Sequence, residues 1–393
     1  MKRVFLLDVY EKHVNGFSTY KKAIQTCLGK YPVELYQIIE NSPVQEVKID
    51  KKGKIIRFHI PYIPDINPCQ YYYFVIYSLL KQYIQDSQEN IFMLNYSPAY
   101  RVLKTLKECF HMSKTIYIIH DFIWAHYVLG DIEKFKKVIH ENQHEKNLEY
   151  IQKAYEDNRK AFAISDKIVC LSQDTLYLLK SFYQIPLAKI SFIPNGLRDF
   201  YKGKQFVHMN NNRKKILAVG RVTKQKGMLD LLYCFKEVIN RYPDCQLIIA
   251  GHIKEESLCI LDAYIKEHIC FLGEINKTEL YDLYTKVDIG VIPSYYEQCS
   301  YVGIEMKMFG LPIVASDAFG LRNMFNEENA LIASIDRENE KVFQHHLSES
   351  IVQMLTCLPD KLLQYRQKSR ESFLNGYRIK NMQHKYWKLI NNL

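Results

Sequence analysis

Short apolar runs alternate with amphipathic helical stretches along most of this chain, and this alternation restricts its fold more than any other feature. Because a helical stretch separates most successive runs, the runs are expected to form parallel strands with helices packed on the sheet. The predicted strands are 4–9, 55–60, 91–96, 115–121, 167–172 and 190–195, followed by 215–221, 245–251, 270–274, 287–294 and 311–316. The pattern predicts an α/β protein of layered parallel sheets.

A chain of 393 residues that is 48% hydrophobic is long enough for two domains. The run "IPNGL" ends the first strand-rich half, and a polar stretch follows it, so we place the linker within 196–213. We expect domains at 1–197 and 198–375. The remaining residues, 376–393, have apolar side chains at near-helical spacing and predict a terminal helix that returns to the first domain. Simple capping of the second domain is the alternative.

Charge and cysteine usage narrow the class of protein. The net charge is +10, and the 53 Lys and Arg residues are scattered along the chain, which is typical of a solvated surface. The functional alternatives are attraction of a phosphate-bearing ligand or of an anionic membrane. No nucleic-acid motif is present. The ten cysteines contain no C-x-x-C pair, so we expect reduced thiols in the cytoplasm and no zinc site. Because no apolar run could cross a bilayer, any membrane contact would be peripheral, at the inner face.

Two glutamates in "PSYYEQCSYVGIEMKMFGLPIVAS", residues 293–316, stand where a strand gives way to a helix. Glu297 falls on the loop, and Glu305 falls inside a helix that Gly310 closes. Ligands bind beyond the carboxyl ends of parallel strands. A carboxylate among the apolar residues of such a helix would need a hydrogen-bonding partner, and a ribose diol supplies two hydroxyl donors.

A second motif, "AVGRVTKQKGMLDLL" at 218–232, combines a strand end with basic residues and a helix start. Gly220 and Arg221 follow the strand, Lys224 and Lys226 lie on the loop, and the helix begins near Gly227. Backbone donors, a helix N-terminus and cations together suit a diphosphate. The glycine spacing does not continue into the Gly-Lys-Ser/Thr of a Walker loop. The chain also has no Asp-x-Asp pair to hold a divalent metal.

The pair His120 and Asp121 follows a third strand, in the first half of the chain. A histidine at a strand end is more often structural than functional. It gains a functional interpretation only where the two domains face one another across a cleft.

Together these motifs resemble a retaining glycosyltransferase of the GT-B fold, in glycosyltransferase family four. The resemblance consists of the Glu297 to Glu305 spacing, the "GR…KG" loop, "IPNG" at the domain junction, "CFLGEINKTELYDLYTKVDIGVIPS" before the glutamates, "MFGLPIVAS" after them, and "HD". It extends over residues 115–335 and is thin in the first hundred residues, which shape the acceptor site in that family. It implies two Rossmann-like domains that face each other across a central cleft.

The resemblance also implies a role for each matching residue. Arg221 and Lys226 would bind the diphosphate of a nucleotide-sugar donor, and Glu305 the ribose hydroxyls. Glu297 and the backbone of the next residues would hold the sugar, with His120 beside the reacting carbon. The implied donor site comprises Gly16, Gly220, Arg221, Lys226, Glu297, Cys299, Ser300, Tyr301 and Glu305. The family usually has Gly-aromatic-Gly after the first glutamate, whereas this chain has Gln298, Cys299 and Ser300, and non-glycine residues narrow the sugar pocket.

We therefore expect a metal-independent, retaining glycosyltransferase of glycoconjugate biosynthesis that needs no cofactor. Its donor would be a UDP- or GDP-linked sugar, and its acceptor a lipid-linked, saccharide or polypeptide molecule. Two alternatives remain open: a sugar-nucleotide epimerase of the same fold, and a catalytically inactive GT-B subunit that binds a partner. An inactive subunit would be expected to lose Arg221, Lys226 or Glu305, and all three are present.

Overall fold

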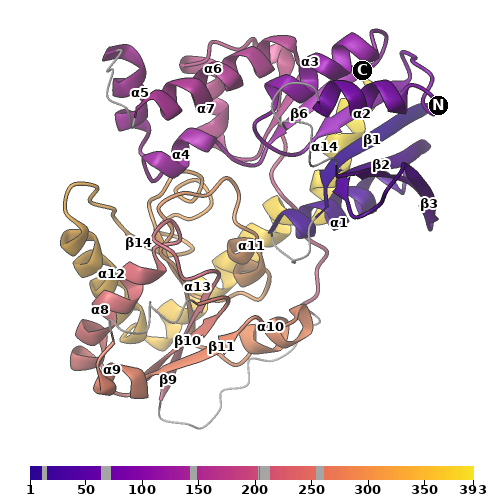
Figure 1. Ribbon diagram of the computed structural model, residues 1–393. Coiled ribbons are helices and arrows are strands. Elements are labelled where there is room, and N and C mark those ends of the chain that lie inside the picture. Colours follow the sequence, from indigo (N-terminus) through magenta and orange to yellow (C-terminus); the bar gives the residue numbers. More distant parts are fainter. Residues whose placement is uncertain (11–15, 63–71, 142–147, 202, 204–212, 254–260) are drawn as a thin grey trace. The chain divides into compact units, whose positions relative to one another are not determined.

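The structure is a computed structural model that describes residues 1–393 except 11–15, 63–71, 142–147, 202, 204–212 and 254–260 (Figure 1). The chain forms two compact units, which are described separately below. Unit 1 comprises Met1–Val128, Ile132–Pro194 and Ile379–Leu393, and unit 2 comprises Leu129–Asp131 and Asn195–Arg378.

Unit 1 is built on one sheet in the order β3-β4-β2-β1-β5-β6-β7-β8. Every neighbouring pair is parallel except β3 and β4. The strands are β1 (Lys2–Val9), β2 (Val33–Ser42), β3 (Lys48–Lys52), β4 (Ile55–Pro61), β5 (Asn90–Leu94), β6 (Lys114–Ile119), β7 (Lys167–Cys170) and β8 (Ile190–Phe192). The sheet reverses its strand order between β1 and β5, so a crevice is expected beyond their carboxyl ends.

The helices of unit 1 pack on this sheet, and the terminal helix is one of them (Figure 1). They are α1 (Gly16–Leu28), α2 (Tyr72–Leu80), α3 (Tyr100–Cys109), α4 (Ile123–Tyr127), α5 (Ile132–Glu141), α6 (Glu149–Ile164), α7 (Gln173–Ser181) and α14 (Ile379–Asn391), with a short 3₁₀ turn at Leu187–Lys189. Helix α14 packs against α1. The hydroxyl oxygens of Tyr20 and Tyr386 are 2.7 Å apart, and the rings of Tyr31 and Trp387 stack with centroids 4.4 Å apart.

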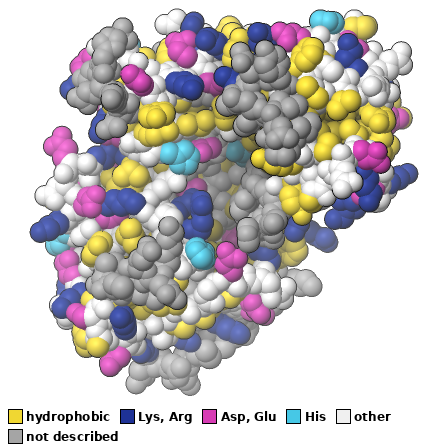
Figure 2. Space-filling model, in the orientation of Figure 1, with side chains coloured by type: hydrophobic (Ala, Val, Ile, Leu, Met, Phe, Trp, Pro, Cys, Tyr) yellow, Lys and Arg dark blue, Asp and Glu magenta, His cyan; other side chains and the backbone are white. Residues whose placement is uncertain are grey.

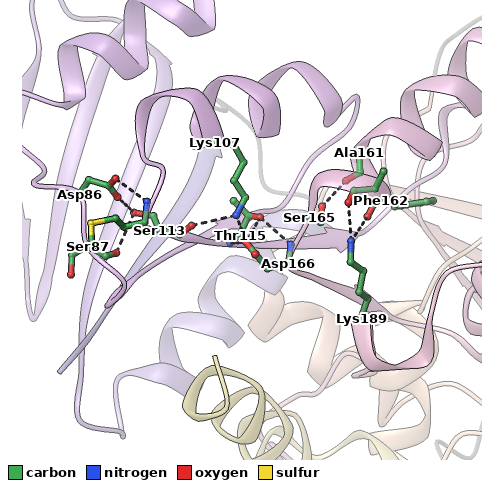
Figure 3. A network of polar contacts seen from close by, with 12 residues as sticks. Asp86, Ser87, Lys107, Ser113, Thr115, Ala161, Phe162, Ser165, Asp166 and Lys189 are labelled. Carbon is green, nitrogen blue, oxygen red and sulfur yellow. Dashed lines mark hydrogen bonds and ion pairs between the residues drawn. The ribbon is translucent and has the colours of Figure 1, made fainter.

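Polar residues at the amino ends of the central strands of unit 1 form hydrogen bonds and ion pairs with one another (Figure 3). Asp166, which precedes β7, accepts hydrogen bonds from the backbone N–H of Thr115 (2.7 Å), from the Thr115 hydroxyl (2.9 Å) and from Lys107. Burial alone would raise the pKa of Asp166, but these donors outweigh it and lower the pKa. The network therefore links the amino ends of β6 and β7.

Unit 2 has a fully parallel sheet in the order β11-β10-β9-β12-β13-β14. Its strands are β9 (Lys214–Val219), β10 (Cys245–Ala250), β11 (Ile269–Gly273), β12 (Ile289–Ile292), β13 (Ile313–Ser316) and β14 (Leu331–Ala333). Its helices are α8 (Met228–Arg241), α9 (Ala263–Glu267), α10 (Lys277–Tyr284), α11 (Tyr301–Met308), α12 (Glu340–Leu355) and α13 (Pro359–Ser372), with a π-helical turn at Phe373–Tyr377. The apolar faces of α8 and α12 pack with these strands into one buried core.

The parallel α/β prediction is confirmed in both units, but three strands were not predicted. Strand β2 has Glu34, Gln37 and Glu40 spaced along it, so its apolar residues do not form a continuous run. Strand β3 is the polar edge strand KIDKK, and β14 has only three residues. The helical stretch predicted from 132 to 165 comprises two helices, α5 and α6, with residues 142–147 outside the described part.

On the face shown in Figure 2, Lys and Arg side chains are interspersed with Asp and Glu side chains. Among the described residues, no helix is both long enough and apolar enough to cross a membrane.

Candidate active site

The strongest candidate site in unit 2 lies where the strand order of its sheet reverses. Strand β9 pairs with β10 on one side and with β12 on the other, and chain order runs outward from it in both directions. In open parallel sheets the crevice at such a reversal is where ligands bind. The loops that leave the carboxyl ends of β9 and β12 are 220–227 and 293–300, the two segments that contain the diphosphate motif and Glu297.

The two loops meet backbone to backbone. Gly227 caps α8 in a left-handed conformation with φ of 62°, and a Cβ at this position would overlap the carbonyl oxygen of Pro293. The backbone N–H of Tyr295 donates to the carbonyl of Gln225 at 2.9 Å. Only glycine permits both this φ and this approach. The loop that carries Arg221 is thus fixed against the loop that carries Glu297.

Glu297 is held in place through its backbone and its side chain. Its N–H donates to the carbonyl of Phe319 (3.1 Å), and the Ser294 hydroxyl donates to its Oε1 (3.2 Å). The Lys226 ammonium donates to the same oxygen at 2.6 Å. Residues from the two motifs, 71 positions apart in sequence, therefore form one ion pair at the switch point of the sheet.

The three cations of the first loop have different environments. Arg221 is exposed and makes no hydrogen bond or ion pair within the described part of the chain. Lys226 is paired with Glu297, as described above. Lys224 donates to both carboxylate oxygens of buried Asp230 (3.0 Å each) and pairs with Glu340 at 2.9 Å. Burial would lower the pKa of Lys224, but these acidic partners raise it. Two carboxylates thus hold Lys224 and one holds Lys226, while Arg221 has no partner in the described part of the chain.

Helix α11 begins at Tyr301, four residues after Glu297. The Ser300 hydroxyl caps it by accepting the N–H of Gly303 at 3.3 Å, so Ser300 has a structural function here. The carbonyl of Cys299 accepts a hydrogen bond from the Asn195 amide at 2.9 Å, and burial raises the pKa of the Cys299 thiol to about 12. Cys299 is therefore a buried thiol that keeps its proton at neutral pH, and Tyr301 is buried as the first residue of the helix. The first N–H groups of a helix have no partner within it, which leaves this end suited to an anionic or hydroxyl ligand.

Glu305 is completely buried in α11, and both of its oxygens accept hydrogen bonds from α10. The Lys277 ammonium donates to Oε1, and the Tyr284 hydroxyl donates to Oε2 at 3.0 Å. Burial raises the pKa of Glu305, while Lys277 and Tyr284 act in the opposite direction. Glu305 therefore has two hydrogen-bonding partners within the protein, Lys277 and Tyr284, and its position in the sequence did not indicate either of them.

The predicted residues of unit 1 lie at the carboxyl edge of the first sheet. His120 follows β6, and its ring packs edge-on against the Tyr20 ring with centroids 4.2 Å apart. Burial lowers the pKa of His120 to about 3, so its imidazole is neutral at neutral pH. Asp121 pairs with His126. Gly16 is the first residue of α1, and the residues before it, 11–15, lie outside the described part.

Sequence reasoning missed a buried carboxylate at the same edge of unit 1. Glu40, near the carboxyl end of β2, accepts hydrogen bonds from the hydroxyls of Tyr77 (2.7 Å) and Tyr96 (2.6 Å). Burial raises the pKa of Glu40 to about 7, although the two tyrosines oppose that shift. Its neighbour Asp8, at the end of β1, pairs with Lys21 at 2.9 Å. Recognising β2 as a strand would have placed Glu40 at this edge.

Glu40 should make the stability of unit 1 depend on pH. The folded protein keeps a proton on Glu40 up to about pH 7, whereas the unfolded chain releases it near the ordinary glutamate pKa of 4.5. Stability from this group therefore falls as pH rises through that window, by about 3 kcal/mol in total. Glu40→Gln removes this titration. We expect the free energy of unfolding of the variant, relative to wild type, to increase by about 3 kcal/mol between pH 4.5 and pH 7.5 in denaturant titrations. A difference that does not change with pH would contradict this assignment.

One group of side chains among the described residues could hold a metal ion, and it lies on helices outside the two loops. Ligand atoms of Glu237 on α8 and of His345 and Glu349 on α12 lie within 4.8 Å of one another. His345 Nδ1 is 3.1 Å from Glu237, and Arg241 already pairs with Glu349. These contacts give both carboxylates of the cluster a partner within the protein, without a metal ion.

Comparisons with known proteins identify chains that are similar in sequence or in fold. Residues 202–353 match the family model of the glycosyl transferases group 1. An uncharacterized glycosyltransferase of Methanocaldococcus jannaschii is 28% identical over 179 residues, which are 42% of this chain and 45% of that protein. An uncharacterized glycosyltransferase of Bacillus subtilis is 26% identical over 217 residues, 53% of this chain and 56% of that protein. The chain thus spans about half the length of these curated relatives.

Solved structures resemble the chain over its whole length. Sucrose-phosphate synthase from Thermosynechococcus elongatus has a TM-score of 0.75 at 17% identity, over 100% of this chain and 99% of that one. A trehalose-6-phosphate synthase studied for glycosyl transfer with retention has a TM-score of 0.70 at 12% identity, over 99% of both chains. Residues 202–353 therefore carry the sequence pattern of the glycosyl transferases group 1, within a chain that has the GT-B fold of two Rossmann-like sheets.

Proposed function

We propose that this protein is a glycosyltransferase that moves a sugar from a nucleotide-sugar donor to an acceptor, without a metal ion and with retention of anomeric configuration. One observation carries the proposal: the Lys226–Glu297 ion pair joins the two loops at the switch point of the second sheet, and the first of these loops also holds exposed Arg221. Retention is supported by the likeness to the trehalose-6-phosphate synthase studied for that outcome.

Cleavage of a sugar–phosphate bond places negative charge on the departing diphosphate. In the proposed mechanism Arg221 binds two phosphate oxygens with its planar guanidinium, and Lys226 supplies a mobile point charge. Cations fixed before the reaction stabilise the leaving group at little cost in reorganisation. Because Arg221 and Lys226 lie on the loop that Gly227 fixes, they can neutralise the departing diphosphate, as a divalent metal ion does in other enzymes.

The remaining residues orient the donor. Glu297 and the first backbone N–H groups of α11 would hold the sugar, and Glu305 would accept hydrogen bonds from the ribose. Neutral His120 would lie beside the reacting carbon, where a neutral imidazole can donate or accept a hydrogen bond but adds no charge. Unit 1 would bind the acceptor, which is a lipid-linked, saccharide or polypeptide molecule. The donor would be linked to UDP or GDP.

The test is a transfer assay in the presence of EDTA. Purified protein is incubated with UDP- and GDP-linked sugars, with and without candidate acceptors, and release of the nucleoside diphosphate is measured. We expect release from one donor, stimulated by an acceptor of one class, and an NMR spectrum in which the product keeps the anomeric configuration of the donor. Interconversion of two sugar nucleotides would instead indicate an epimerase. Binding of donor with no release under any condition would indicate an inactive subunit.

A further inference from the structure

Two tyrosines of unit 1 form a stacked pair at the surface. The rings of Tyr127 on α4 and Tyr150 on α6 have centroids 5.7 Å apart and an interplanar angle of 10°. The two residues are 51% and 58% exposed. Each ring covers only one face of the other, so the pair still offers aromatic surface to a ligand. Single exposed apolar side chains are normal, whereas grouped ones mark interaction sites.

The helices that carry the pair are fixed by their buried faces. Trp124 of α4 is fully buried and stacks on Phe135 of α5, with ring centroids 4.0 Å apart. Ile151 and Ala154 of α6 are buried, and α4 packs against α6 (Figure 1). A ligand that binds the two tyrosines therefore meets rings whose helices are already in place, so little conformational freedom is lost on binding.

The pair follows a strand end at the edge of the sheet where a ligand is expected. Strand β6 ends at Ile119 and α4 begins at Ile123, with His120 and Asp121 in the turn between them. The Ser97 hydroxyl, which follows β5, donates to the Asp121 carbonyl at 3.4 Å. Ligands of open parallel sheets bind beyond the carboxyl ends of the strands. Helix α4 therefore presents its exposed residues on the ligand side of the sheet.

A carboxylate accompanies the rings. Asp121 pairs with His126, which directly precedes Tyr127 on α4, and the two side chains are 38% and 46% exposed. His126 contacts Oδ2 of Asp121, and Oδ1 has no partner in the described part of the chain. Lys153, one turn after Tyr150 on α6, is also exposed. Groups that bind water thus accompany both rings, and covering them with an acyl chain would be costly.

We propose that Tyr127 and Tyr150 are a stacking platform for a saccharide acceptor, whose hydroxyls donate to Asp121. One face of a pyranose carries C–H groups, which the electron-rich face of an aromatic ring attracts. Its edge carries hydroxyl donors, which a carboxylate oxygen accepts. An acyl chain has C–H groups but no donor for the carboxylate. This inference rests on the proposed function, because it selects the saccharide among the acceptor classes given there.

The experiment is saturation-transfer NMR on the purified protein without donor. The probes are neutral disaccharides of gluco, galacto and manno configuration in α and β linkage, together with octyl β-glucoside. We expect at least one disaccharide to bind, with saturation strongest on the C–H protons of one sugar face. Tyr127→Ala and Tyr150→Ala should each weaken that binding about tenfold. Tyr127→Phe and Tyr150→Phe keep the rings and should bind within about threefold of wild type.

Tyr177→Ala is the matched control, because Tyr177 on α7 is a 63% exposed tyrosine of the same unit, and this variant should bind as wild type does. Asp121→Asn should weaken binding, because an amide oxygen is a weaker acceptor than a carboxylate.

Three results would overturn the platform and leave the proposed function intact. They are the absence of binding by every disaccharide, equal binding by wild type and both alanine variants, and binding of octyl β-glucoside through its alkyl chain alone, which would indicate a lipid acceptor. Because the NMR samples contain no donor, failure of the proposed function is seen separately, as absence of nucleotide binding and of nucleotide release. That failure would end the acceptor role as well.

Discussion

Arg221→Ala is expected to lower the turnover of sugar transfer by about a hundredfold or more, and transfer by the wild-type protein is expected to persist in excess EDTA. The loss of one preorganised donor to a developing negative charge typically reduces turnover by about a hundredfold to a thousandfold. Arg221 has no partner in the described structure, so its removal leaves no internal group unpaired. The variant should therefore unfold at the wild-type temperature. Steady-state kinetics with a matched donor measure the effect.

Lys226→Ala should reduce turnover at least as strongly, for an additional reason. It removes a cation and also leaves the Glu297 carboxylate without its ion-pair partner at 2.6 Å, beside the expected diphosphate. Lys226→Arg should not retain full activity, because a planar guanidinium does not replace a mobile ammonium group.

Two lysines provide controls for these variants. Lys236→Ala changes an exposed lysine on α8 and should leave turnover unchanged. Lys224→Ala removes the cation that pairs with buried Asp230, so it should lower thermal stability more than it lowers donor affinity. Near-normal turnover in both Arg221→Ala and Lys226→Ala, together with loss of activity in EDTA that magnesium restores, would show that the mechanism is wrong.

Glu305→Gln is expected to weaken binding of the matched nucleoside diphosphate by about 1.5–3 kcal/mol, the range for a hydrogen bond to a charged group. Glutamine keeps the shape of the side chain and can still accept the Tyr284 hydroxyl, but it loses its charge opposite Lys277. Titration calorimetry measures the change. Exposed Glu327→Gln is the control and should bind as wild type does. Unchanged affinity in a folded Glu305→Gln variant would remove Glu305 from the site.

Local patterns were sufficient to predict the architecture of the candidate site. Gly227 before α8, Ser300 before α11 and Gly310 after it are short-range signals, and the structure has helix ends at these positions. The strands before each loop are continuous apolar runs buried on both faces, which a single sequence displays clearly. The loops that hold Arg221 and Glu297 could therefore be placed at strand ends before any coordinates were known.

The features of the site that the sequence did not predict are contacts between residues far apart in the chain. Lys277 and Glu305 are 28 positions apart, and no local pattern indicates that they form an ion pair. Lys224 and Lys226 look equivalent in the sequence, yet one pairs with Asp230 and the other with Glu297. Such pairings depend on how helices pack on the sheet. The expected approach of His120 to Glu297 is also long-range, and it stays a prediction.

The most direct test of the central claim is calorimetric titration of the wild-type protein with UDP and with GDP in EDTA, repeated with the Arg221→Ala/Lys226→Ala double variant. The account predicts that one nucleotide binds the wild-type protein without a metal, and that the double variant binds it at least about a hundredfold more weakly. Absence of binding by both nucleotides, or equal affinity in the double variant, would contradict the assignment of these loops as a diphosphate site.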